Sequence, residues 1–205
     1  MADALRSIGH EALVPNLVGA ARTGDPGAFV RAAVDAARSK DDLIVVGHSG
    51  AGALLPCVAA RLAPSVRMTV WVDAGMPPCE GSYRTGGDFL PTLRALADNG
   101  MLPEWAQWWG DGVLEALVRN DQRRREIEQE LPNVPLAFYE AAIKVPIGWC
   151  AGPGAYVLLS DAYRSDAATA ASRGWPVVER LGAHLDIVND EEAIAAILTN
   201  LADHP

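Results

Sequence analysis

A serine surrounded by small residues stands directly after a short run of apolar, mostly β-branched residues. The run Leu43–Val46 predicts a buried strand, and the segment Gly47–Ala51 (Gly-His-Ser-Gly-Ala) predicts a sharp turn. Small neighbours let a strand and the following helix approach closely, which would hold Ser49 in a strained turn with its Oγ exposed. Such a serine could act as a nucleophile, with the N–H of Gly50 as a donor to an oxyanion. The fifth position of the usual G-x-S-x-G pattern is alanine here, and Gly52 follows it.

Two other interpretations of this turn stay open from the sequence. Gly47, Gly50 and Ala53 approximate the G-x-x-G-x-x-A/G loop of dinucleotide-binding proteins. Asp73 then ends a predicted strand roughly 20 residues later, where a ribose-binding carboxylate would lie in an NAD(P)-binding oxidoreductase. The third interpretation is a tight strand-to-helix turn without chemistry.

A nucleophilic serine needs a base within hydrogen-bond reach, and the base needs an orienting group. His184 lies in a glycine-flanked loop between the last predicted strand and the last predicted helix. His48 immediately precedes Ser49 and is expected to line the pocket or to point away from Oγ. His10 lies ahead of the first clear strand and His204 lies at the C-terminal end, so His184 is the preferred base.

With these residues the chain resembles the α/β-hydrolase superfamily from about residue 10 to its C-terminus. The resemblance is carried by the turn Gly47–Ala51, the strand after the helix that follows it, a helical insert and the loop Gly182–Leu185. It implies that Ser49 is the nucleophile, that His184 is the general base and that the Gly50 N–H is an oxyanion donor.

The resemblance leaves the acid of a Ser-His-Asp triad open. The commoner place is after the strand that follows the insert, where Asp161 stands, with Asp166 further on. The other place is the end of the strand after the nucleophile helix, as in haloalkane-dehalogenase-like members, and Asp73 holds it. Asp73 and Asp161 are equally favoured, and Asp166 is third.

The remaining elements must position these residues. Alternating helices and strands predict a mostly parallel sheet with helices on both faces, in one domain over residues 1–205. A tryptophan-rich segment from about 77 to 150 shows no convincing strand, and we expect it to form a helical cap over a pocket. The strands are predicted at Glu11–Leu17, Leu43–Val46, Val66–Val72, Ala155–Ser160 and Trp175–Leu181.

The resemblance also concerns the start of the chain. Family members carry strands before the point that corresponds to Met1, and one of these leads into a loop that supplies a second oxyanion N–H. We therefore expect an N-terminally short α/β-hydrolase fold without that loop. An open sheet edge beside the nucleophile strand would favour pairing with a second copy, so a homodimer is possible.

Composition limits the partners of the protein. The net charge of −9 and the pI near 4.8 argue against nucleic acid and anionic membranes as partners. No apolar run approaches the ~20 residues that span a bilayer, and the N-terminus lacks the form of a signal peptide. Cys57, Cys79 and Cys150 are widely spaced, so each is expected to be a small buried hydrophobe in a reducing, cytoplasmic compartment. No metal site or cofactor is expected.

The sequence thus predicts a serine hydrolase that cleaves an ester, thioester or lactone of a small apolar substrate through an acyl-enzyme. The alternative is a catalytically silent or truncated hydrolase-fold protein that binds a small ligand. An NAD(P)-binding oxidoreductase is the third hypothesis, and it leaves His184 without a role.

Overall fold

A computed structural model describes residues 1–110 and 112–203. The strands are β1 (Leu43–Ser49), β2 (Val66–Ala74), β3 (Ser82–Tyr83), β4 (Met101–Leu102), β5 (Val134–Pro135), β6 (Ile143–Lys144), β7 (Gly154–Leu158) and β8 (Val177–Glu179). The α-helices are α1 (Ala2–Ser7), α2 (Val18–Ala21), α3 (Pro26–Ala37), α4 (Leu55–Leu62), α5 (Phe89–Leu96), α6 (Val113–Leu117), α7 (Asp121–Glu130), α8 (Ala137–Glu140), α9 (Arg164–Ser172), α10 (Asp186–Asn189) and α11 (Glu191–Asp203). Short 3₁₀ helices are η1 (Gly50–Leu54), η2 (Trp105–Gln107), η3 (Trp149–Ala151) and η4 (Asp161–Tyr163).

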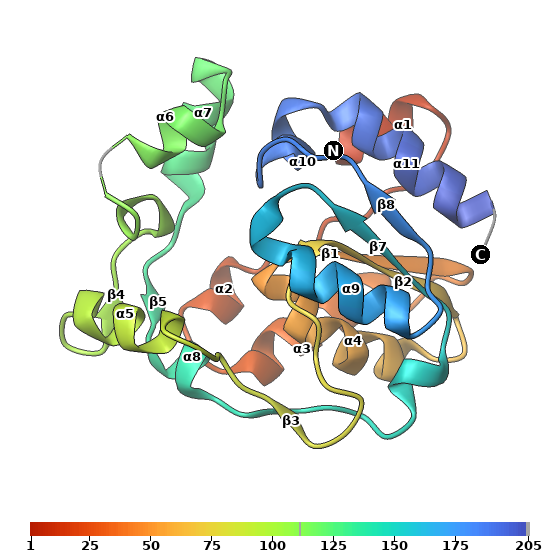
Figure 1. Ribbon diagram of the computed structural model, residues 1–205, viewed down its shortest axis with the longest axis horizontal. Helices are drawn as coiled ribbons and strands as arrows, with labels where there is room; N and C mark the ends of the chain where they lie inside the picture. The colour runs from red at the N-terminus through yellow and green to blue at the C-terminus, as the bar shows by residue number, and fades with distance from the viewer. Residues whose placement is uncertain (111, 204–205) are drawn as a thin grey trace.

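The main sheet has the order β1-β2-β7-β8, and all its strands run parallel (Figure 1). Its topology agrees with the predicted parallel sheet with helices on both faces. Because the strands are parallel, their carboxyl ends meet at one edge of the sheet. The loops that carry Ser49, Asp73 and Ser160 leave from that edge.

Each face of the sheet is covered by helices. Side chains alternate along β2, so Met68, Val70 and Val72 pack with α11 and α1, whereas Trp71 packs on the other face with α9 and the start of α4. Helices α3 and α4 cover β1 on that second face. Helices α1 and α11, close to the two chain ends, lie side by side (Figure 1).

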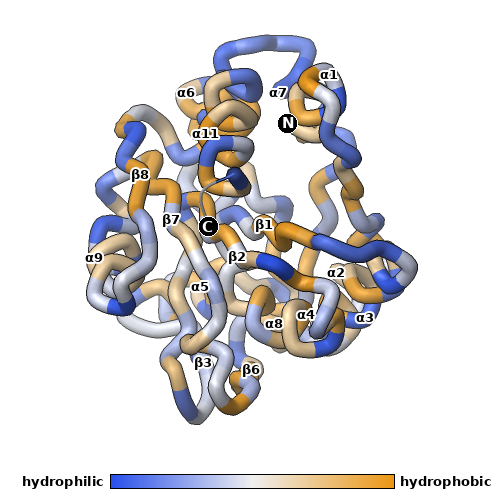
Figure 2. Tube along the Cα trace, turned by 90° about the vertical axis from the view of Figure 1, so that its right-hand side faces the viewer, coloured by the Kyte–Doolittle hydropathy of each residue, from blue (hydrophilic) through white to orange (hydrophobic). Residues whose placement is uncertain are grey.

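The segment 75–153 leaves the main sheet between β2 and β7 and carries the helices α5–α8. Figure 1 shows α5, α6 and α7 beside the sheet rather than in it, and Figure 2 shows α7 as a mostly hydrophilic helix. This segment has its own apolar cluster, centred on Leu93, Leu102 and Trp108. The prediction that it holds no strand is wrong, because β3 pairs with β6 and β4 with β5. Strands of two residues are too short to show an alternating pattern.

Of two other local predictions, one is wrong and one is confirmed: a predicted strand is absent, and a predicted helix forms. The strand predicted at Glu11–Leu17 is absent, since the described residues there form no ladder and Pro15 lacks a backbone donor. The helix expected after the turn Gly47–Ala51 does form, as η1 followed by α4. Pro56 lies in the first turn of α4, where a missing N–H is tolerated.

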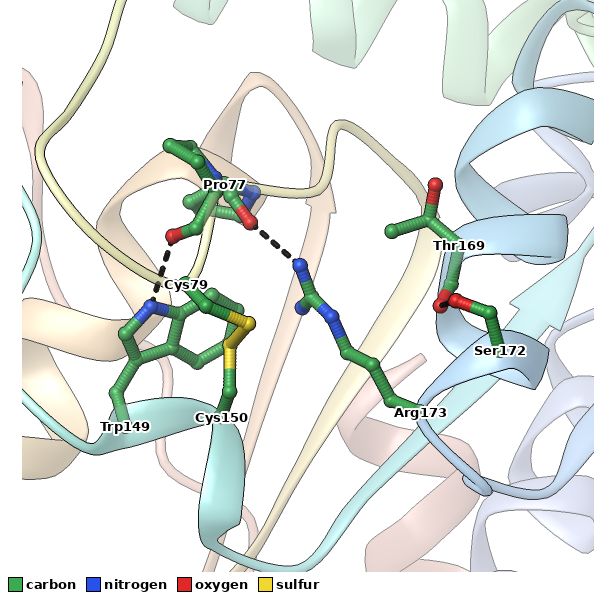
Figure 3. The surroundings of a disulfide bond; sticks show 8 residues. Pro77, Cys79, Trp149, Cys150, Thr169, Ser172 and Arg173 are labelled. Carbon is green, nitrogen blue, oxygen red and sulfur yellow. Dashed lines mark hydrogen bonds between the residues drawn. A yellow bond between two sulfur atoms is a disulfide. The ribbon is translucent and has the colours of Figure 1, made fainter.

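A disulfide joins Cys79 to Cys150, 71 residues apart, and so ties together the two ends of the segment 75–153 (Figure 3). Next to it, the Arg173 guanidinium lies 4.8 Å over the Trp149 ring and donates to the Pro77 carbonyl at 2.8 Å.

The expectation that Cys79 and Cys150 are unpaired hydrophobes is wrong, because they form this disulfide. Their wide spacing in the sequence gave no sign that folding brings them together. Disulfides persist in oxidising environments, so the cysteines no longer support a reducing compartment. Each helix in the described ranges is too short or too polar to cross a bilayer.

Candidate active site

Ser49 stands at the end of β1 in a strained turn. Its φ is 55° and its ψ is −127°, a backbone conformation that residues with a side chain seldom adopt. The close approach behind the turn is at Gly52, where a Cβ would lie 2.4 Å from the carbonyl oxygen of Gly75. Ala51 is exposed and faces no such contact, which explains why alanine is tolerated at the fifth position of the motif. The turn therefore needs glycine one residue later than the usual pattern.

Asp73 and His184 meet at the carboxyl edge of the sheet. His184 Nδ1 lies 2.7 Å from Asp73 Oδ2. With Nδ1–H donating to this carboxylate, Nε2 of a neutral His184 is left as an acceptor, which is the state of a general base. Asp73 is fully buried, and it lies one residue before the end of β2 in an unusual backbone conformation, with φ at 43°.

Four hydrogen bonds hold the Asp73 carboxylate. Oδ1 accepts the N–H groups of Leu159 and Ser160, both at 2.9 Å, and Oδ2 accepts the Ser160 hydroxyl at 2.6 Å besides His184. Burial by itself would raise the pKa of Asp73, but the hydrogen bonds from His184, Ser160 and the two N–H groups keep that pKa below its usual value. Asp73 is thus held ionised next to His184. Its lone pairs are all engaged, which argues against the ribose-binding role in the dinucleotide interpretation.

His48 supports His184 from the other side. Its Nε2 donates to the backbone carbonyl of His184 at 2.9 Å, and the two rings stack with centroids 4.4 Å apart. Burial, together with the nearby charge of His184, lowers the pKa of His48 from 6.5 to about 4. His48 is therefore neutral at pH 7 and positions the loop that carries His184.

We expect this histidine to make folding stability depend on pH. Between pH 6.5 and 4 the unfolded chain binds a proton on His48 and the folded chain does not, so stability falls as the pH falls through this range. The loss from this one group is at most about 3 kcal/mol. Urea unfolding of the wild type and of His48→Gln at pH 7, 5.5 and 4.5 tests this. The variant should lose less stability between pH 7 and 4.5, and parallel curves would contradict the prediction.

The hydroxyl of Ser49 has a partner that the sequence did not indicate. Ser49 Oγ lies 3.3 Å from the hydroxyl of Tyr163. Within the described residues Ser49 makes no hydrogen bond to His184, a contact that is often long before substrate binds. Gly50 opens η1, so its N–H is among those that a helix leaves unpaired, and a Cβ on Gly50 would meet nothing within 4 Å. Gly50 therefore has open space beside its Cα, next to Ser49.

A buried acid fixes the loop of His184. Asp186 is 1% exposed, and it accepts the N–H of Ala183 and side-chain bonds from Arg180, Arg119 and Asn189. Burial would raise its pKa, but these bonds lower the pKa of Asp186 below the usual value. Since Arg119 lies between α6 and α7, the network also joins the segment 75–153 to the loop.

The other candidate residues lie apart from this arrangement. Asp161 is exposed and pairs with Arg164 at 2.6 Å. Asp166 accepts the N–H of Met76 at 2.7 Å. His10 lies near Thr199, with Nε2 3.0 Å from Oγ1, and His204 is outside the described residues.

Sequence reasoning missed the roles of Ser160 and Tyr163. The place of Ser160 at a strand end was a usable signal, but nothing in the sequence marked Tyr163. No group of three or more His, Cys, Asp and Glu residues that could hold a metal ion occurs in the described part of the chain.

Comparisons with known proteins give one partial sequence match and several structural matches. No protein-family model matches the chain. A carbendazim-hydrolyzing esterase from Nocardioides sp. (strain SG-4G) is 33% identical over 143 residues, in a match that covers 65% of this chain and 55% of that protein. The chain thus spans about half the length of this curated relative.

Solved structures match over nearly the whole chain. An extracellular α/β-hydrolase from a Paenibacillus species, described as sharing homology with tobacco salicylic acid binding protein 2, has a TM-score of 0.74 at 17% identity, covering 98% of this chain and 90% of its own. Polyneuridine aldehyde esterase has a TM-score of 0.65 at 11% identity, covering 96% and 90%. The chain has the α/β-hydrolase fold, as its motifs predicted.

Proposed function

We propose that the protein is a serine hydrolase that cleaves an ester, thioester or lactone of a small apolar substrate. The observation that carries this proposal is the Asp73–His184 pair, bonded at 2.7 Å, beside a serine in a strained turn. The esterase names of the similar proteins support the same reaction class.

The reaction follows from the roles of three side chains. His184 Nε2 takes the proton of Ser49 as Oγ attacks the substrate carbonyl, and the Gly50 N–H donates to the resulting oxyanion. His184 then gives the proton to the leaving oxygen or sulfur, and an acyl-enzyme remains. Water, deprotonated by His184, releases the acid. Asp73 stays ionised throughout and stabilises the imidazolium.

We further propose that the segment from about 77 to 150 acts as a cap. Arg119 donates its backbone N–H to Asn189 Oδ1, and Asn189 Nδ2 donates to the Leu117 carbonyl, so this segment is bonded to elements beside the loop of His184. Trp109 is half exposed and stacks on Phe89, with ring centroids 5.7 Å apart, and such aromatic surface suits an apolar substrate.

Labelling with a fluorophosphonate tests the proposal directly. We expect one covalent adduct by intact mass, located on Ser49 by peptide mapping. It should be absent in Ser49→Ala and in the denatured wild type. Absence of an adduct, or an adduct on another serine, would overturn the proposal. Ligand-dependent tryptophan fluorescence without labelling would favour the silent-binder alternative.

A further inference from the structure

Tyr163 touches both groups that react in the proposed mechanism. Its hydroxyl lies 3.3 Å from Ser49 Oγ, and its ring stacks on His184 with centroids 5.2 Å apart and 14° between the planes. Neither the motif nor the family resemblance gave this residue a role. A side chain in contact with the nucleophile oxygen and with the base can affect the chemistry itself.

The position of Tyr163 is fixed by the residues that hold the acid. Tyr163 ends η4, and its N–H donates to the carbonyl of Ser160 at 3.3 Å. Ser160 in turn bonds Asp73 through its N–H and its hydroxyl. The loop that carries Tyr163 is therefore anchored to the same carboxylate that orients His184. These bonds therefore hold the Tyr163 hydroxyl next to Ser49.

We propose that Tyr163 is a further catalytic residue, whose hydroxyl donates a hydrogen bond to Ser49 Oγ while negative charge develops on that oxygen. This inference rests on the proposed hydrolase function. In acylation, Oγ loses its proton to His184 and bonds to the carbonyl carbon. In deacylation, the bond between the acyl carbon and Oγ breaks, and Oγ takes a proton back from His184. Tyr163 keeps its own proton in both steps.

The physical reason is a difference between ground and transition states. Oγ carries more negative charge in both transition states than in the free hydroxyl or the ester, so the hydrogen bond is strongest when the barrier is crossed. Burial raises the pKa of Tyr163 above its ordinary value of 10, although the contact with Ser49 acts in the opposite direction. The hydroxyl is therefore protonated at neutral pH and serves as a donor, not as a base.

The test is Tyr163→Phe, which removes the hydroxyl and keeps the ring that stacks on His184. We expect the rate of fluorophosphonate labelling of Ser49 and kcat for 4-nitrophenyl esters to fall about 10- to 100-fold, with KM and the melting temperature unchanged. Thr169→Val is the matched control, because it removes a hydroxyl that lies on α9 and donates to the Ser165 carbonyl at 2.9 Å, and it should react like the wild type. Position 163 carrying 3-fluorotyrosine, which keeps the hydroxyl, should also retain the wild-type labelling rate.

Each outcome bears on the inference. Wild-type rates in Tyr163→Phe would overturn it while leaving the proposed function intact. An equal loss with 3-fluorotyrosine would also overturn it, since the hydroxyl is present there. Failure of the unmutated chain to label on Ser49 would refute the hydrolase function first, and this inference with it.

Discussion

Replacing Asp73 with asparagine is expected to lower kcat/KM for ester hydrolysis by about 10⁴-fold with the fold intact. The amide oxygen can still accept the N–H groups of Leu159 and Ser160, which the carboxylate Oδ1 accepts at 2.9 Å. The amide nitrogen then faces His184 Nδ1 and reverses the direction of that hydrogen bond. His184 would carry its proton on Nε2 and could no longer take the proton of Ser49.

Asp161→Asn is the matched control for this variant. Asp161 stands at the end of the neighbouring strand, but its side chain is 80% exposed and pairs with Arg164 on the surface. Such a pair contributes little to stability, and among the described residues no hydrogen bond joins Asp161 to His184. Its kcat/KM should stay within about twofold of wild type. A large loss in Asp161→Asn together with full activity in Asp73→Asn would contradict the assignment of the acid.

The elements around Ser49 and His184 could be predicted because their signals are local. The apolar strand and the small residues of the turn Gly47–Ala51 lie within a few positions of one another. The loop of His184 is marked by Gly182 and by its place between a strand and a helix. Four parallel strands with helices on both faces follow from the alternation of elements along the chain.

The carboxylate partner of His184 could not be chosen from the sequence because the choice depends on contacts between loops. Asp73 lies near the end of β2 and Asp161 follows the adjacent parallel strand β7, so both lie at the same edge of the sheet. The two aspartates differ in their contacts, because the Asp73 carboxylate accepts the N–H groups of Leu159 and Ser160, which are 86 and 87 residues away in the sequence. The contact of Tyr163 with Ser49 spans 114 residues and is hidden from the sequence for the same reason.

The double variant Cys79→Ser/Cys150→Ser should be less stable than the wild type by about 4 kcal/mol. The disulfide closes a loop whose ends are 71 residues apart, and removing it returns that conformational freedom to the unfolded chain. For a chain of this size the melting temperature should fall by about 10 °C. Thermal and urea unfolding measure both quantities. Under reducing conditions the wild type should behave like the variant, and the variant should not respond to the reductant.

Cys57→Ser is the control, because Cys57 is the free cysteine, and its thiol donates to the Lys144 carbonyl at 3.4 Å. Denatured, unreduced wild type should therefore show one reactive thiol, whereas three would mean that the disulfide does not form. Labelling of Ser49 should depend less on the disulfide than the stability of the fold does. Trp149 Nε1 donates to the Pro78 carbonyl at 3.0 Å next to the disulfide, so both ends of the segment 75–153 are held against each other even without it (Figure 3). Reduction should therefore lower stability while Ser49 labelling persists below the new melting temperature, since Asp73, His184 and Ser160 lie outside the closed loop.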